Sequence, residues 1–439
     1  MKNIFCFLIL LILSHKVYCQ GFLSNEEIHD AFNYSIETLR SAHPDSVYKI
    51  GINDVSEVSI DYSKYKNLHE VTYFVCRDLD LEQEILKLRN NQHLITLGVY
   101  SNNATSFPSA ILNLRHLNTL ILTGMEIDSI PSEIEKLNHL KELSLGHPFS
   151  GGISLKYLPQ SISKLRNLKN IDLWGNMDYV LPNWFYKLEL DELHITFLKG
   201  FEFNKVCEML SLKTLTLEGT ELKDLSGISK LTNLRELYFS QSNDLVSLGT
   251  DFINLPSLES LELKFVNSMD VKKEFQKLAY LPRLKSLQLD VEEGIEGLSN
   301  NRINGFKSLK ELDITALGGN QTLDMANVLN SFSLVKSLEK LSLSRFKETQ
   351  LPLELFQYSN LKTLKISSCD ISSISSKIVL LTNLEELKFW YVPIKSLPKS
   401  LLKIPNLKGI YLGRTEVSEQ DKVLEKLYKN GVKKLSWVN

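Results

Sequence analysis

The feature that most constrains this chain is a six-residue pattern, L-x-x-L-x-L, in which Ile, Val, Phe, Tyr or Trp can replace Leu. It occurs seventeen times, at spacings of 21 to 29 residues. A unit this short cannot bury its apolar side chains alone, so successive units must stack into a solenoid. The pattern begins at Val47, Leu68, Leu94, Leu117, Leu140, Leu168, Leu190, Leu212, Leu234, Leu258, Leu284, Leu309, Leu338, Leu361, Leu384, Leu407 and Val432.

Each unit combines two periodicities, which are clearest between residues 117 and 139. Leu117, Leu120 and Leu122 have the spacing of a short strand whose alternate side chains enter a core. Ile130-Pro131, followed by Ile134, indicates a helical turn begun by proline, which lacks an N–H that the first turn leaves unbonded. Each unit is therefore predicted to be a strand, a bend and a short helix or 3₁₀ turn. The same proline start recurs at Phe107-Pro108, Leu158-Pro159, Leu181-Pro182, Leu351-Pro352 and Leu397-Pro398.

With these units the chain resembles the leucine-rich repeat proteins, in a style found among exported bacterial members without cysteine-rich caps. The resemblance implies an α/β solenoid, or horseshoe, with a parallel concave β-sheet of seventeen strands and a helical or 3₁₀ convex side. In that family the ninth position of the unit carries Asn or a small residue that bonds to neighbouring backbone. Here small or polar residues stand at Asn102, Asn176, Cys76, Cys369, Thr220, Thr415 and Ser242, but the series is broken at Met125, Pro148, Leu198, Val266, Phe346 and Val392.

The domain organisation follows from the repeat. Residues 47–416 contain no Pro/Gly/Ser-rich linker, so we expect one elongated domain without a hinge. The least regular units lie between Leu284 and Leu338, where we expect loops at 292–297 and 318–320 that protrude from the rim.

The amino terminus resembles an export signal. Residues 1–19 begin with a short positive segment and continue with an unbroken apolar run, Ile4 to Leu13, that is too short to span a bilayer comfortably. We expect cleavage after Cys19; lipidation of Cys19 and an uncleaved anchor are the alternatives, and only these two would attach the chain to a membrane. The predicted location is outside the cytoplasm: secreted, periplasmic or at the cell surface.

Both ends of the array carry predicted caps. Residues 20–46 form an N-terminal capping helix, with a capping box at Ser24 to Glu27 and an end at His43-Pro44. Residues 417–439 form a helix that starts with the capping sequence Ser418 to Asp421, and a last strand with a charged edge. The apolar stripes are Ile28, Phe32, Ile36 and Leu39 in the first helix, and Val423, Leu424 and Leu427 in the second. Asn430-Gly431 ends the second helix, and Val432, Leu435 and Trp437 carry the strand, in which Lys433 and Lys434 supply the charge.

Composition and motifs argue against several functions. The chain has 50 Lys and Arg against 52 Asp and Glu, which provides no global attraction for nucleic acid. No catalytic motif, phosphate-binding loop or metal-ligand spacing occurs, so we predict no enzyme and no cofactor. Cys76, Cys207 and Cys369 are too far apart in the array for disulfides or a metal site. The histidines that precede strand leucines, His93, His116 and His139, are predicted to be exposed turn residues.

What remains is the concave surface. Along the fifth position the residues change from acidic, Glu262 and Asp313, to basic, Lys365 and Lys388. Trp, Tyr and Arg dominate the energetics of protein interfaces, so two clusters are candidate partner-binding sites. The C-terminal cluster is Lys388, Trp390, Tyr391, Tyr411 and Arg414; the middle cluster is Trp174, His194 and Tyr238. In the competing interpretation, Trp390 only packs over its neighbour and protects the terminal sheet.

Two functions fit this surface. The resemblance favours a noncatalytic exported recognition protein that binds a protein partner through the concave face. The alternative is a cell-surface carbohydrate-binding or adhesive protein, in which exposed aromatic rings stack on a glycan. A glycan site would favour carboxylates and amides around its aromatic ring, whereas the C-terminal cluster is basic.

Overall fold

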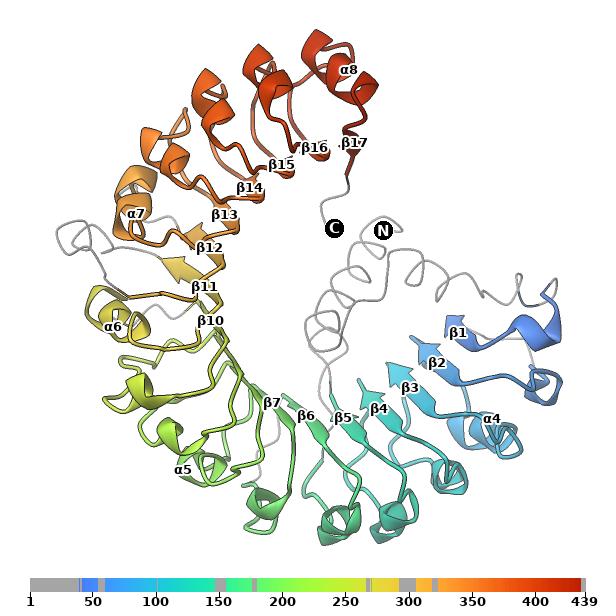
Figure 1. The fold of residues 1–439 in the computed structure, drawn as a ribbon. Helices are drawn as coiled ribbons and strands as arrows, with labels where there is room; N and C mark the ends of the chain where they lie inside the picture. Colours follow the sequence, from blue (N-terminus) through green and yellow to red (C-terminus); the bar gives the residue numbers. More distant parts are fainter. Residues whose placement is uncertain are drawn as a thin grey trace. The chain divides into compact units, whose positions relative to one another are not determined.

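The computed structural model describes residues 39, 42–53, 60–100, 102–146, 155–175, 180–265, 269, 271–291, 305–317 and 323–435. The chain divides into two compact units, Met1–Leu212 and Lys213–Asn439. The boundary falls within the repeat array and follows no linker. The expected single domain without a hinge therefore stays a prediction, whereas the predicted parallel strands and short helical turns are present in both units (Figure 1).

The first unit contains seven described strands, each parallel to the next and aligned without a slip. Each strand begins two residues after the first residue of the predicted pattern, so the fourth and sixth positions of the unit point into the core. The strands are β1 (Lys49–Asn53), β2 (Glu70–Phe74), β3 (Thr96–Tyr100), β4 (Thr119–Thr123), β5 (Glu142–Leu145), β6 (Asn170–Trp174) and β7 (Glu192–Thr196).

The second unit continues the same plan with ten described strands, again all parallel. They are β8 (Thr214–Glu218), β9 (Glu236–Ser240), β10 (Ser260–Lys264), β11 (Ser286–Val291), β12 (Glu311–Ala316), β13 (Lys340–Ser344), β14 (Thr363–Ser367), β15 (Glu386–Trp390), β16 (Gly409–Gly413) and β17 (Lys433–Lys434). Both lysines of β17 are exposed, as the sequence predicts.

Short helices connect most of the successive strands in the described residues. The α-helices are α4 (Leu81–Leu86), α5 (Phe203–Val206), α6 (Val271–Leu278), α7 (Met325–Ser331) and α8 (Lys422–Lys429). The 3₁₀ helices are η1 (Pro44–Ser46), η2 (Tyr62–Lys64), η3 (Ser109–Asn113), η4 (Ser132–Lys136), η5 (Gln160–Lys164), η6 (Phe185–Lys187), η7 (Ile228–Lys230), η8 (Phe252–Asn254), η10 (Leu353–Gln357), η11 (Ser376–Leu380) and η12 (Lys399–Lys403).

Proline marks the starts of the 3₁₀ turns, one residue earlier than predicted. Pro131 is the N-cap of η4 in an extended conformation, and its carbonyl accepts the first bond of the turn, from the Ile134 N–H at 3.1 Å. The same arrangement holds at Pro108, Pro159, Pro352 and Pro398. Pro182 is the exception, because η6 has Trp184 as its N-cap. An N-cap position, like the first turn, needs no N–H from the residue.

The ninth position of the unit is buried in most of the described units, whether its residue is polar or apolar, although Thr415 is partly exposed. Asn102 Nδ2 donates to the Leu79 carbonyl at 3.2 Å, and Thr220 and Ser242 bond to each other through their hydroxyls at 3.1 Å. Cys76 and Cys369 donate to strand carbonyls at 3.2 Å. The breaks in the polar series are filled by Met125, Leu198, Phe346 and Val392, all buried.

At the eighth position of the unit, just after the strand, the backbone turns. It is left-handed there: φ is 52° at Tyr391 and 57° at Arg414. The Tyr391 N–H then donates to the Gly413 carbonyl of the next strand at 3.0 Å, which fixes the turn. Gly219, with φ of 60°, holds the same position in another unit, but most units place a side chain there despite a strain of about 1–2 kcal/mol.

The predicted caps are described unequally. Of the N-terminal helix, Leu39 is described; it is helical and 5 % exposed. In the C-terminal helix α8 the predicted stripe of Val423, Leu424 and Leu427 is buried, and Asn430 ends the helix. The predicted start needs correction: Asp421, and not Ser418, is the N-cap, because its carboxylate accepts from the N–H groups two and three residues on.

Several predictions concern residues outside the described ranges. These are the signal segment 1–19 with Cys19, the stripe residues Ile28, Phe32 and Ile36, the loops at 292–297 and 318–320, and Asn176, Pro148, Val266 and Trp437. Among the helices of the described residues, none combines the length and the apolar character that a membrane crossing requires.

Candidate binding face

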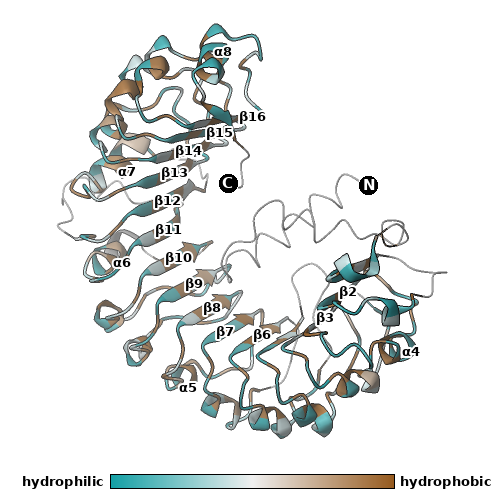
Figure 2. Ribbon diagram, turned by 45° about the vertical axis from the view of Figure 1, so that its right-hand side comes forward, coloured by the Kyte–Doolittle hydropathy of each residue, from teal (hydrophilic) through white to brown (hydrophobic). Residues whose placement is uncertain are grey.

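The third, fifth and seventh positions of each unit lie on the face of the sheet that points away from the core, and we call this the sheet face. Hydrophilic and hydrophobic residues occur together within the strands of both units, as alternation across a sheet requires (Figure 2). Because the strands are in register, side chains of one position form a row along the sheet. The rows therefore decide what each unit can bind.

The C-terminal cluster forms one connected group on β15, β16 and the turns after them. The rings of Trp390 and Tyr411 stack with centroids 5.8 Å apart and planes at 17°. Tyr391 meets Trp390 edge-on at 5.1 Å, and the Arg414 guanidinium lies 5.8 Å from the centre of the Tyr391 ring. Tyr391 is 52 % exposed, so this group faces solvent in part.

A glycine makes room for the stack. Gly413 stands directly opposite Trp390 on the neighbouring strand. A Cβ atom added at Gly413 would lie 2.3 Å from the Tyr411 hydroxyl oxygen and 2.4 Å from the Trp390 ring, far inside contact distance. The two rings therefore occupy the space that a side chain at residue 413 would fill.

Two lysines stand side by side next to this stack. Lys365 on β14 is opposite Lys388 on β15, and Lys388 is opposite Tyr411 on β16. Lys388 is fully buried, and its Nζ lies 3.3 Å from a carboxylate oxygen of Glu386 but has no hydrogen-bond partner. Burial, followed by repulsion from Lys388, lowers the pKa of Lys365.

Carboxylates crowd the other end of the sheet face in the second unit. Glu218 on β8 and Asp290 on β11 are 7 % and 6 % exposed. Burial, with repulsion from Glu262, raises the pKa of Glu218 to about 7. Burial also raises the pKa of Asp290 to about 6, although Lys264 opposes it, and raises that of Asp313. Lys264 pairs with Glu262 at 3.1 Å and also attracts Asp290 and Asp313, so one lysine serves three carboxylates.

The residues of the middle cluster are divided between the two units. Trp174 on β6 packs edge-on against Phe197 at 5.7 Å, and His194 on β7 lies 3.8 Å from both Asp172 and Glu192. Tyr238 belongs to the second unit, where its hydroxyl donates to Glu236 at 2.8 Å. Trp174 and His194 therefore lie on neighbouring strands of the first unit.

A second aromatic stack, which the sequence analysis missed, lies in the first unit. The rings of Phe74 and Tyr100 stack at 5.3 Å and 16° over the glycines of the fifth position. A Cβ added at Gly98 would approach the Tyr100 ring to 3.2 Å, and one at Gly51 would approach Phe74 to 3.4 Å. Gly98, two positions before Tyr100, was the available signal in the sequence.

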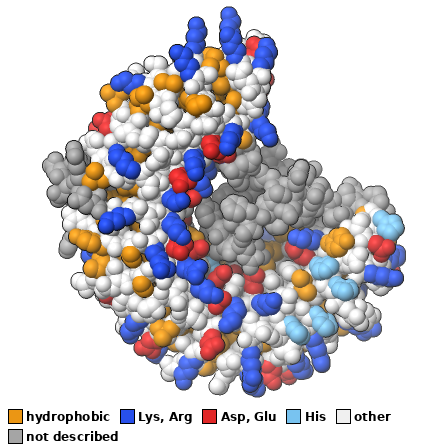
Figure 3. Space-filling model, in the orientation of Figure 1, with side chains coloured by type: hydrophobic (Ala, Val, Ile, Leu, Met, Phe, Trp, Pro, Cys, Tyr) orange, Lys and Arg blue, Asp and Glu red, His pale blue; other side chains and the backbone are white. Residues whose placement is uncertain are grey.

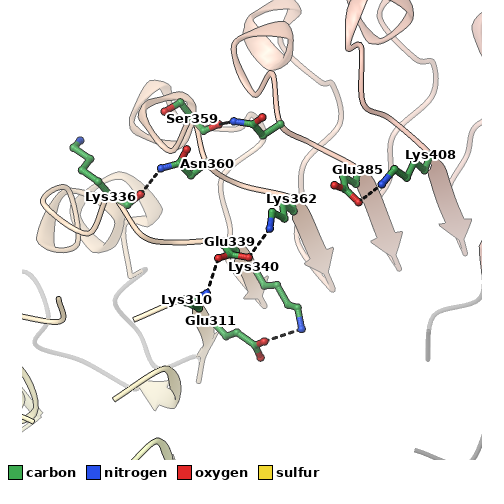
Figure 4. Close-up of polar contacts among 11 residues, drawn as sticks. Lys310, Glu311, Lys336, Glu339, Lys340, Ser359, Asn360, Lys362, Glu385 and Lys408 are labelled. Atoms are coloured by element: carbon green, nitrogen blue, oxygen red, sulfur yellow. Dashed lines mark hydrogen bonds and ion pairs between the residues drawn. The ribbon is translucent and has the colours of Figure 1, made fainter. Parts of the chain in front are cut away.

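The residues just before the strands differ between the units. In the first unit His93, His116 and His139 are exposed, as predicted, and the His116 and His139 rings lie 6.1 Å apart. Histidine side chains gather over this unit in Figure 3, whereas Lys and Glu alternate over the second. There Glu339 pairs with Lys310 at 3.0 Å and with Lys362 at 2.8 Å, and Glu385 pairs with Lys408 at 2.7 Å (Figure 4). These charges are mutually satisfied and leave little for a partner.

The described residues offer no metal centre. Cys76, Cys207 and Cys369 are buried free thiols. Within the described ranges, no three His, Cys, Asp or Glu side chains converge as metal ligands would. The charged groups missed by the sequence analysis, Glu218, Lys264 and Asp290, all hold the seventh position, one row beyond the fifth-position row whose charge change was recognised.

The chain is similar to known proteins in parts of its sequence and in its structure. No protein-family model matches the chain. Over 197 residues the chain is 32 % identical to a volume-regulated anion channel subunit of Homo sapiens; the match covers 43 % of this chain and spans only 23 % of that protein. A leucine-rich repeat protein of Leptospira interrogans is similar in structure, with 21 % identity, a TM-score of 0.49, and coverage of 92 % of this chain and 99 % of that one. The Drosophila Toll protein, in complex with Spatzle, has 16 % identity, a TM-score of 0.45, and coverage of 88 % and 48 %.

Proposed function

We propose that this leucine-rich repeat protein is a noncatalytic recognition protein that binds a protein partner through the sheet face of its second unit. The observation that carries the proposal is the C-terminal cluster, in which Trp390, Tyr391, Tyr411 and Arg414 contact one another beside a row of charged side chains. Stacked, partly exposed aromatic rings offer large contact area with little loss of conformational entropy on binding.

The dimensions of the face also suit a protein. Strands β8 to β16 follow one another at about 4.8 Å, so this face extends for roughly 38 Å. A standard protein interface needs about 800 Å² on each partner, which such a face supplies. The rings are accompanied by lysines and arginine, a setting that favours acidic protein side chains over neutral sugars.

We also propose that the chain is exported, on the strength of the apolar run Ile4 to Leu13 after a positive start. Amino-terminal sequencing of the protein recovered outside the cytoplasm tests this. Gln20 as the first residue supports cleavage, and an acylated Cys19 would assign a lipid anchor instead. Retention of the full chain in the cytoplasm would contradict export.

The binding proposal is tested by recovering partners with the purified chain from native membrane and culture fractions. Trp390→Ala and Tyr411→Ala should each weaken binding of the recovered partner by about 2 kcal/mol, roughly thirtyfold, with little change in melting temperature. Tyr100→Ala, in the stack of the first unit, is the matched control, and Trp174→Ala tests the middle cluster.

The outcomes separate the two interpretations of the cluster. If Trp390→Ala lowers the melting temperature and leaves affinity intact, the residue is a packing lid and the site assignment is wrong. If binding follows glycan rather than protein, shown by loss of capture after deglycosylation, the carbohydrate-binding alternative replaces the proposal.

A further inference from the structure

The charged rows of the second unit are sorted along the sheet. Carboxylates predominate on β8 to β12, at Glu218, Glu262, Asp290 and Asp313, and lysines follow at Lys365 and Lys388 on β14 and β15. If these charges only stabilised the fold, we would expect opposite charges to alternate, as they do among the paired lysines and glutamates just before the strands. Opposite charges also pair on the sheet face, as at Lys264 and Glu262, but Lys365 and Lys388 stand next to each other, and carboxylates repel one another around Glu262, which raises the energy of the unbound protein.

At the basic end of the sheet face, formed by Lys365 and Lys388, the environment of Lys388 most favours an anionic ligand. A fully buried ammonium without a hydrogen bond is costly, and the carboxylate of Glu386 at 3.3 Å does not supply one. Its strand neighbour on one side is another lysine, Lys365. An incoming carboxylate would satisfy the ammonium and relieve the repulsion between the two lysines, and the flexible lysine stem allows Nζ to turn toward it.

At the acidic end, formed by the carboxylates on β8 to β12, the environment favours a cationic ligand. Glu262, Asp290 and Asp313 interact with the single charge of Lys264, and neighbouring carboxylates oppose ionisation of both Glu218 and Asp290. Gln241 Nε2 donates to one oxygen of Glu218, but this donor is neutral and does not offset the charge of the carboxylate. Cationic side chains of a ligand would compensate it.

We propose that the sheet face of the second unit binds an extended protein segment with separated charge blocks, its basic residues over β8 to β12 and its acidic residues at Lys365 and Lys388 beside the Trp390–Tyr411 stack. This rests on the proposed function and specifies the partner. From β10 to β15 there are five strand intervals, about 24 Å, which an extended segment of about seven residues spans.

The test uses synthetic fluorescent peptides and the full chain. One peptide carries a block of lysines, a short Gly-Ser spacer and a block of aspartates ending in phenylalanine. Its control has the same composition with alternating charges. We expect the block peptide to bind at least tenfold more tightly by fluorescence anisotropy, since only separated blocks match both ends at once. Equal affinities would overturn the proposal.

Variants locate the two ends. Lys388→Met and Lys365→Met should each weaken the block peptide about tenfold, and Lys388→Arg should keep most of the affinity. Glu262→Gln should weaken the same peptide but leave an aspartate-block peptide unaffected. Because Lys388→Met removes a buried ammonium that lacks a hydrogen bond and lies beside Lys365, we also expect its melting temperature to rise, which a purely structural lysine would not show.

Two results contradict the proposal without touching the proposed function. Lys388→Met could lower the melting temperature and leave the affinity for the block peptide unchanged. A sulfated oligosaccharide could bind through Lys365 and Lys388 more tightly than any peptide, which would assign the site to an anionic glycan. If a natural partner still depends on Trp390 but binds through a segment without charge blocks, the recognition function stands and this specification of the partner falls.

Discussion

The two units use the same repeat but put their polar side chains in different places. In the first unit, the fifth and seventh positions of β1 to β5 carry no charge, while Tyr62, Tyr73 and Glu84 are buried in the core and bonded to one another. The second unit also buries hydrogen-bonded polar groups away from its strands, at Glu274 and Tyr358, but among the described residues it alone buries carboxylates and a lysine on the sheet face, at Glu218, Asp290 and Lys388. Buried polar groups that satisfy each other specify a fold, whereas unsatisfied ones on a face are available to a ligand.

The largest effect that we predict from this comparison is in the apolar core of the second unit. Phe275, Phe306 and Phe332 pack together with ring centroids 5.2 to 5.6 Å apart. We expect Phe332→Ala to lower the free energy of unfolding by about 3–5 kcal/mol, because the cavity cannot collapse fully. Urea unfolding would measure this, with the exposed Leu334→Ala as the control below about 0.5 kcal/mol.

The ends of the two units provide the next test. Leu39 is 5 % exposed in the first unit and Leu427 is 2 % exposed in α8 of the second. Replacing either leucine by Ala should cost about 2–4 kcal/mol if each covers its end of the sheet. A cost below about half a kcal/mol for Leu39→Ala in denaturant melts would show that the helix containing Leu39 is undocked.

The charged sheet face predicts a stability effect that depends on pH. Because the pKa of Glu218 is raised from 4.5 to about 7, the folded chain holds a proton between these values that the unfolded chain has released. The contribution of this group to stability therefore falls as pH rises through that window. Glu218→Gln should gain about 3 kcal/mol relative to the natural chain between pH 4 and pH 8.

Urea melts at both pH values check this difference. Glu259→Gln is the control, because ion pairing with Lys285 lowers the pKa of Glu259 at the surface and its removal should change stability little. If the stability gained by Glu218→Gln does not grow with pH, the ionised Glu218 carboxylate is not destabilised on this face.

The smallest expected effect concerns the polar core of the first unit. Tyr62 donates to Glu84 at 2.8 Å and meets the Tyr73 hydroxyl at 3.1 Å. Tyr73→Phe removes only the contact between hydroxyls and should lower the free energy of unfolding by about 1 kcal/mol. Tyr62→Phe also removes the hydrogen bond to the buried Glu84 carboxylate and should lower it more. Equal costs in denaturant melts would show that the network does not depend on Glu84.

The candidate site was only partly visible in the sequence. Trp390, Tyr391, Tyr411 and Arg414 were predicted to cluster, and they do, because residues at matching positions of successive units become neighbours in a parallel sheet. Trp174, His194 and Tyr238 were grouped on the same logic, and a role for them in binding stays a prediction. Their spacing along the chain gave the strands correctly, but the contact of Trp174 with Phe197 came only from the structure.

The sequence by itself determined the repeating unit. The positions of the leucines decide which residues face the core and where each strand starts, since alternation and helical periodicity follow from backbone geometry alone. The tertiary structure alone decided the energetic state of the face. Whether Lys388 is buried without a hydrogen bond, whether Gly413 leaves room for two stacked rings, and whether Glu218 ionises easily depend on neighbours from other units. Those neighbours are more than twenty residues away along the chain, and only stacking of the units brings them into contact.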